Sequence, residues 1–236
     1  AKDWTGVSVG NKSWYGVAYG GGRFVAIGAY TDEDVAWASV SDLDNWTLTT
    51  TGASNASFRS ITYGNGKFVA VKNSTSDRVM YSSDGTSWQT ASTVTNNGSW
   101  NDIAFGNGNF VAVSNSGTYP VMTSPDGDNW TPQTVPSGAS NLWWSVTYGN
   151  GYFVAVNYNG PYSVMYAHES NLTNWTLVTG ATNDEWTSVT YGDGKFVAVS
   201  YKGNYTMWAD ENDLDKVWNE AIEAARNRSI ELGRNK

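Results

Sequence analysis

The chain contains no cysteine, one histidine and few charged residues, and each shortage removes a class of function. Without cysteine there is neither a disulfide framework nor a thiolate metal site. Charged residues make up only 15% of the chain, its formal net charge is −8, and its six arginines are scattered. No basic face is therefore available for phosphate groups, and we expect neither nucleic acid nor an anionic membrane surface as a partner.

Long apolar runs are also missing. No stretch approaches the 18 consecutive apolar residues of a membrane-spanning helix, and the first residues lack the layout of a signal peptide. We expect a soluble protein without membrane insertion. Aromatic residues, in contrast, are abundant: 13 Trp and 14 Tyr occur in 236 residues, which indicates a folded globular chain.

A nine-residue segment occurs five times along the chain. It reads Tyr-Gly-Gly-Gly-Arg-Phe-Val-Ala-Ile at residues 19–27, and related segments begin at Tyr63, Phe105, Tyr148 and Tyr191. An aromatic residue precedes the central Phe of each segment at a constant distance, namely Trp14, Phe58, Trp100, Trp143 and Trp186. A Trp follows the central Phe in each unit, namely Trp46, Trp88, Trp130, Trp175 and Trp218. Such strict repetition predicts an array of similar structural units.

Each unit of about 43 residues has the pattern of four short strands. Alternation before the Gly-x-Gly step predicts one strand, Phe-Val-Ala-Val a second, and residues such as Val79–Tyr81 a third, with a fourth beginning near the Trp. Four strands per repeat is the blade of a β-propeller. We predict an all-β fold, a five-bladed β-propeller of four-stranded blades over residues 1–209, with a strand at 4–9 closing the last blade. The alternative, an all-β sandwich, would not repeat so strictly.

The last unit departs from the pattern after its Trp. Residues 213–232 place Leu214, Val217, Trp218, Ala221 and Ile222 on one stripe, which predicts a C-terminal α-helix within a tail spanning 210–236. This helix either packs on the propeller or provides a site for a protein partner or for self-association.

Two turns carry a family resemblance. Residues 82–88 read Ser-Ser-Asp-Gly-Thr-Ser-Trp and residues 124–130 read Ser-Pro-Asp-Gly-Asp-Asn-Trp. Both resemble, in a form one residue shorter, the Asp-box of sialidase-like propellers, and the whole unit is similar to repeats in bacterial and bacteriophage surface or tail proteins. The resemblance implies that Asp84 and Asp126 are structural, and that the protein is found outside the cell or on a virion or cell surface.

The sequence does not contain the residues of a sialidase active site. The three arginines of the repeats, Arg23, Arg59 and Arg78, do not converge, because the turns that carry Arg23 and Arg78 open on opposite faces of a propeller. His168 has no evident Ser or Asp partner and is expected to be an ordinary surface residue. We therefore expect no enzyme activity, no catalytic or metal-binding residues and no cofactor.

Comparison of the units separates constant turns from variable loops. The loops between the second and third strands differ in every unit and are rich in Tyr, Asn, Ser and Gly, a composition suited to adaptable contacts. An aromatic ring can stack on a sugar ring while amides and hydroxyls bind its hydroxyl groups. The predicted ligand-binding residues are Tyr30, Tyr119, Tyr158, Tyr162, Tyr201 and Tyr205.

These observations predict a non-enzymatic, lectin-like propeller that binds glycans for adhesion or receptor recognition. A protein-interaction scaffold attached through its C-terminal helix is an alternative from another class. A glycosidase with paired carboxylates in the channel is a third. The near-regular repeats also fit an engineered or reconstructed propeller without a native function.

Overall fold

The computed structural model describes residues 5–29, 33–53, 57–73, 79–94, 98–139, 141–160, 163–178 and 184–201, and the backbone of 206–210. The predicted helix 213–232 and three predicted ligand residues, Tyr30, Tyr162 and Tyr205, lie outside these ranges. No helix long and apolar enough to cross a membrane occurs in this part of the chain.

The described residues form five antiparallel sheets, each built from strands consecutive in sequence. The first contains β1 (Ser13–Gly20), β2 (Arg23–Ala29), β3 (Val35–Ser39) and β4 (Asp42–Thr49). The second contains β5 (Phe58–Gly64), β6 (Lys67–Lys72), β7 (Val79–Ser82) and β8 (Gln89–Thr90). The third contains β9 (Trp100–Gly106), β10 (Asn109–Ser114), β11 (Val121–Ser124) and β12 (Thr131–Gln133). The fourth contains β13 (Trp143–Gly149), β14 (Tyr152–Asn157), β15 (Val164–His168) and β16 (Thr176–Leu177), and the fifth contains β17 (Trp186–Gly192), β18 (Lys195–Ser200) and β19 (Thr206–Asp210). The all-β fold of repeated antiparallel units is thus confirmed.

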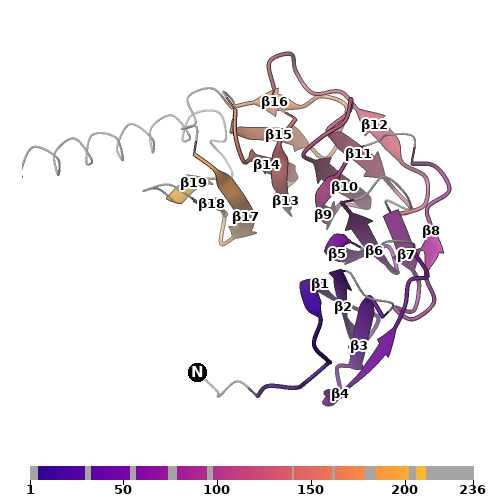
Figure 1. Ribbon diagram of the computed structural model, residues 1–236. Helices are drawn as coiled ribbons and strands as arrows, with labels where there is room; N and C mark the ends of the chain where they lie inside the picture. The colour runs from indigo at the N-terminus through magenta and orange to yellow at the C-terminus, as the bar shows by residue number, and fades with distance from the viewer. Residues whose placement is uncertain are drawn as a thin grey trace, which may run out of the picture.

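The five sheets stand side by side along an arc (Figure 1). The first strands of the sheets lie on its inner side, where β1 contacts β5, β5 contacts β9, β9 contacts β13 and β13 contacts β17. Among the described residues no comparable contact joins β17 to β1, and the two strands lie at opposite ends of the arc (Figure 1). Residues 5–9 form no strand, and the fifth sheet has three strands in the described part of the chain. The strand predicted at 4–9 is therefore not observed over residues 5–9.

The turn between the first two strands of each sheet explains the Gly-x-Gly step. Asn65 and Gly66 both have positive φ, at 46° and 75°, and Asn107 and Gly108 repeat this conformation. Two successive residues with positive φ form the tight hairpin turn whose twist matches that of the flanking strands, and Asn-Gly is its preferred sequence. The repeat therefore conserves a backbone geometry at this turn.

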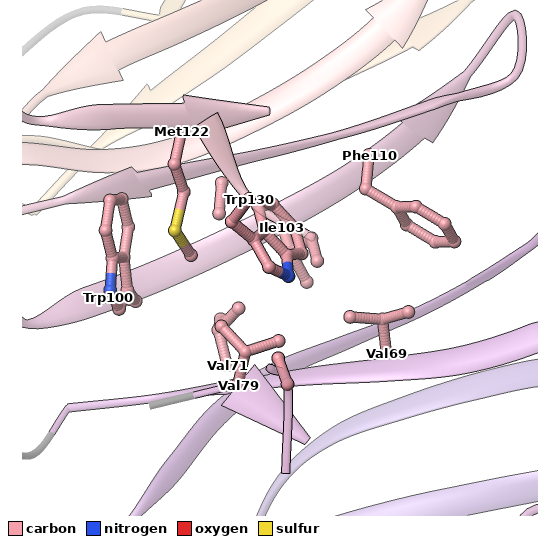
Figure 2. Close-up of a cluster of buried hydrophobic side chains, with 10 residues drawn as sticks. Val69, Val71, Val79, Trp100, Ile103, Phe110, Met122 and Trp130 are labelled. Carbon is pink, nitrogen blue, oxygen red and sulfur yellow. The ribbon is translucent and has the colours of Figure 1, made fainter. Parts of the chain in front are cut away.

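The core lies between the sheets. In the Phe-Val-Ala-Val strands, alternate residues point to opposite faces, and both faces are buried in the three central sheets. Figure 2 shows the interface between the second and third sheets, where Val69, Val71 and Val79 face Trp100 and Phe110. Similar clusters occupy the other three interfaces. Each of the three central sheets thus buries its two faces against two different neighbours.

A glycine and an aromatic ring meet at the inner edge of every interface. A Cβ atom on Gly64 would lie 2.1 Å from the ring of Phe105, and one on Gly106 would lie 2.0 Å from the ring of Tyr148. Gly20 and Gly149 stand in the same relation to the next aromatic residue. Glycine is required here because the ring of the next sheet occupies the space of its missing side chain.

The two turns that resemble an Asp-box stabilise themselves. The Asp84 carboxylate accepts hydrogen bonds from the amides of Thr86 (2.8 Å) and Ser87 (2.7 Å), and Asp126 accepts the equivalent bonds in the third sheet. Burial opposes ionisation of Asp84, but these hydrogen bonds outweigh it and hold the pKa of its carboxyl well below the ordinary value. The carboxylates act within their own turns, as predicted.

Candidate functional site

Each inner strand carries a β-bulge directly after its leading Trp or Phe, where the register with the next strand shifts. A bulge redirects the side chain of its extra residue, and bulges are frequent beside functional sites. The residue before the bulge is a Trp or Phe in all units, whereas the bulge residue differs in every one. We call these residues the bulge row: Tyr15, Arg59, Asn101, Trp144 and Thr187.

Members of the bulge row contact each other or the residue that follows the second strand. The Arg59 guanidinium lies 4.9 Å from the centre of the Tyr15 ring. The side-chain amide of Asn73 donates from Nδ2 to Oδ1 of Asn101 at 3.4 Å. Trp144 lies against Tyr158, with 5.0 Å between ring centres. The row therefore follows the rim of the arc on the side of the variable loops.

The contact between Trp144 and Tyr158 is part of an aromatic cluster between the fourth and fifth sheets. Trp144 comes from β13 and Tyr158 follows β14, whereas Glu185 precedes β17 and Tyr201 follows β18. The Tyr158 amide donates to the carbonyl of Leu142 at 3.0 Å, and the Tyr201 amide donates to the carbonyl of Glu185 at 2.8 Å. These backbone hydrogen bonds hold each tyrosine beside the inner strand of its own sheet. We refer to Trp144, Tyr158, Glu185 and Tyr201 as the aromatic cluster.

Electrostatics link the two sheets within this cluster. The Tyr158 hydroxyl donates to Oε2 of Glu185 at 3.1 Å. This hydrogen bond is the main cause of a raised pKa of the Tyr158 phenol, because removing its proton would leave two negative oxygens in contact. Trp144 and Tyr201 remain exposed to solvent. The cluster therefore offers flat apolar surfaces beside the Glu185 carboxylate.

The structure brings together two of the tyrosines predicted as ligand residues, Tyr158 and Tyr201. Tyr119 is exposed in the loop between β10 and β11 of the third sheet and is not a member of the cluster. In the second and third sheets, the position of Tyr158 is occupied by Asn73 and Asn115, which make the corresponding backbone hydrogen bonds. Among the described residues, the paired tyrosines thus occur at one interface.

Sequence reasoning missed Trp144, Glu185 and the pair formed by Tyr15 and Arg59. A signal for the bulge-row members was present, because the position after the leading Trp or Phe is the one position of the inner strand that differs in every unit. No sequence signal pointed to Glu185, since its role depends on the next sheet lying within reach of Tyr158.

Asp102 is the carboxylate most enclosed by the inner strands. It accepts hydrogen bonds from the hydroxyls of Ser60 (2.6 Å) and Ser145 (2.8 Å) and from the Val146 amide (3.0 Å). Desolvation raises the pKa of Asp102, although these hydrogen bonds act in the opposite direction. These partners come from the two sheets on either side of its own, which identifies Asp102 as a structural link.

His168 and the acidic residues form no metal-ligand cluster within the described residues. His168 is exposed at the end of β15, where its Nδ1 is 2.8 Å from the hydroxyl of Ser170 and its ring meets Tyr152 edge-on. These contacts orient the imidazole within its own turn.

Solved structures resemble this arrangement of sheets. A structure entitled YCF48 bound to D1 peptide matches with a TM-score of 0.65 at 16% identity, over 91% of this chain and 72% of the other. The nidogen/laminin complex matches with 0.62 at 15% identity, over 86% and 78%. Virginiamycin B lyase from Staphylococcus aureus matches with 0.66 at 11% identity, over 86% and 72%. These are β-propeller proteins. The chain has their fold.

No protein-family model matches the chain, and no curated protein does so either. At 11–16% identity the structural matches establish the propeller fold alone. The five sheets are therefore blades of a propeller, and the aromatic cluster lies between its fourth and fifth blades. Whether the repeats belong to the sialidase-like family stays a prediction.

Proposed function

We propose that this chain is a non-enzymatic binding propeller that holds a carbohydrate on the aromatic cluster. The observation that carries the proposal is the exposed Trp144 stacked beside Tyr158, whose hydroxyl is bonded to Glu185. The indole of Trp144 can pack on the apolar face of a sugar ring, because its ring is a large apolar surface that is partly exposed to solvent. The Glu185 carboxylate can accept hydrogen bonds from the sugar hydroxyls at the edge of that ring.

The architecture favours binding at this place. Two rigid sheets supply the four side chains, and the backbone hydrogen bonds of Tyr158 and Tyr201 fix their positions. A site held in this way loses little conformational entropy when a ligand binds, which increases affinity. Recognition of glycans at a bacterial or virion surface, as the repeat resemblance implies, belongs to this proposal.

A protein-interaction scaffold is the second candidate. Leu142 is exposed, and its backbone carbonyl accepts the hydrogen bond from the Tyr158 amide. Its side chain adds an aliphatic surface that suits a peptide better than a sugar. The similar structures include a propeller bound to D1 peptide and a nidogen/laminin complex. A peptide with a basic residue would pair with Glu185 and place apolar side chains on Trp144 and Leu142.

A glycan array probed with the purified chain tests the first proposal. We expect sugar-selective binding that is lost when Trp144 and Tyr201 are both changed to Ala, with the far-ultraviolet circular dichroism unchanged. A double variant of Tyr119→Ala with Tyr15→Ala removes two exposed tyrosines from other blades and should retain binding. No selective binding by the wild type would overturn the carbohydrate proposal, and a screen of peptides would then test the second candidate.

A further inference from the structure

The two ends of the arc expose apolar positions that the internal blades bury. Val17 in β1 is 60% exposed, whereas its equivalents Ile61, Ile103, Val146 and Val189 are at most 7% exposed. In β18, Val197 and Val199 are 38% and 44% exposed. The residues that correspond to them in the other four blades are fully buried, namely Val25, Ile27, Val69, Val71, Val111, Val113, Val154 and Val156.

The two exposed surfaces are the opposite halves of the interface that joins the blades. The first-blade face consists of Val17, Tyr19, Phe24 and Ala26, which occupy the positions that each later blade packs on the blade before it. The fifth-blade face consists of Ser188, Gly192, Val197 and Val199, which occupy the positions that each earlier blade offers to the blade after it. Each of the four internal interfaces is formed by one surface of the first kind and one of the second kind.

The glycine and aromatic pairs make this complementarity specific. Gly149 receives the ring of Tyr191, whereas no atom of the described residues lies within 4 Å of a Cβ atom placed on Gly192. Tyr19, 53% exposed, begins the same series of aromatic residues at the other end. The space over Gly192, which at the equivalent glycines is filled by the ring of the next blade, is therefore open to a ring such as that of Tyr19.

Polar groups follow the same order. The Ser145 hydroxyl accepts a hydrogen bond from the Val189 amide of the next blade at 3.3 Å, and Ser188 holds the equivalent position on the fifth-blade face, where it is exposed. Lys67 donates from Nζ to the carbonyl of Asp126 in the next blade at 2.8 Å, and Lys195 stands at the corresponding place. The fifth-blade face thus carries both the apolar and the polar parts of a blade interface.

We propose that copies of this chain associate head to tail, with the fifth-blade face of one copy packed on the first-blade face of another. The occupant is a second copy because that copy brings the matching surface, with Tyr19 opposite Gly192 and Val17 opposite Val199. This contact would continue the series of internal interfaces with the same geometry. It is a heterologous contact, which leaves one face of each kind free on a dimer and allows further addition.

Sedimentation velocity over a wide range of protein concentration, with the full chain, tests this proposal. The wild type is expected to grow from monomer to dimer and larger species as its concentration rises. Val17→Glu and Val197→Glu each place a carboxylate in one face, and each variant alone is expected to remain monomeric. Val40→Glu, at an exposed turn outside both faces, is the matched control and should associate as the wild type does.

Mixing the two blocked variants distinguishes head-to-tail association from other kinds. Each variant retains one intact face of a different kind, so the mixture is expected to form a dimer that neither variant forms alone. A mixture that stays monomeric while the wild type associates overturns the proposal. So does a wild type that is monomeric at every concentration, and in that case a loss of stability in Val17→Glu would indicate that the two faces close on each other within one copy.

Discussion

The ionised carboxylates of Asp84 and Asp126 make the free energy of unfolding depend on pH through two turns. Hydrogen bonds from the following amides lower the pKa of both carboxyls in the folded state, although burial acts in the opposite direction. A group with a lowered folded pKa stabilises the fold above its unfolded pKa, about 4 for Asp, and this stabilisation is lost as the pH falls below that value. Both groups therefore favour the folded state at neutral pH and lose this effect in acid.

Replacing both residues by Asn keeps the shape of the turns and removes the charge. We expect Asp84→Asn with Asp126→Asn to lower the denaturant midpoint at neutral pH and to flatten its decline below about pH 4. Urea unfolding at a series of pH values measures both effects, and Asp44→Asn controls for the change in net charge. An unchanged dependence on pH in the double variant would contradict this assignment.

Gly106 provides a second prediction at the scale of single residues. Gly106→Ala would place a methyl group 2.0 Å from the Tyr148 ring, whereas the same change at Gly192 meets nothing within 4 Å. Overpacking of this kind costs roughly 1–3 kcal/mol. We therefore expect chemical unfolding of the dilute protein to show a clear loss of stability in Gly106→Ala and little change in Gly192→Ala. Equal effects of the two substitutions would contradict the proposed packing.

At the scale of the structural element, Asp102 joins three blades. Its hydrogen bonds reach Ser60 in the second blade and Ser145 and Val146 in the fourth. Asp102→Ala leaves these donors without their acceptor, at a cost of roughly 1–3 kcal/mol. We expect lower stability in urea together with faster hydrogen exchange of the Val146 amide. If exchange at Val146 stays as slow as in the wild type, Asp102 does not link the blades.

The sequence predicted the elements better than it predicted the site. The repeated Phe-Val-Ala-Val or Phe-Val-Ala-Ile strands and the Gly-x-Gly turns determine each blade through local alternation and turn geometry, so Phe110 and Asn107 could be placed in advance. The contact of Tyr158 with Glu185 depends on how two blades lie against each other, which the pattern within one blade does not contain. The paired tyrosines were anticipated individually, but Trp144 was not: its position varies between the units, yet only the strand register reveals the bulge that redirects its side chain.

At the scale of the whole molecule, the fold has one kind of interface used repeatedly. Every internal interface combines apolar and glycine–aromatic contacts, and the two ends of the arc (Figure 1) carry the two halves of such an interface. The aromatic cluster uses a different part of the same architecture, since it lies where the rims of the fourth and fifth blades meet. Constant contacts hold the blades together, and the variable rim between them carries the site that we propose for carbohydrate binding.

The most direct test of this account is calorimetric titration of the sugar that the glycan array selects. The account predicts that Trp144→Ala weakens its affinity tenfold or more, about 1.4 kcal/mol, because the stacking surface is removed. Tyr119→Ala, in a loop of the third blade, should leave the affinity within about twofold of the wild type, well below the energy of one stacking contact. The opposite result, a large loss with Tyr119→Ala and none with Trp144→Ala, would contradict the account and move the site to the loop between β10 and β11.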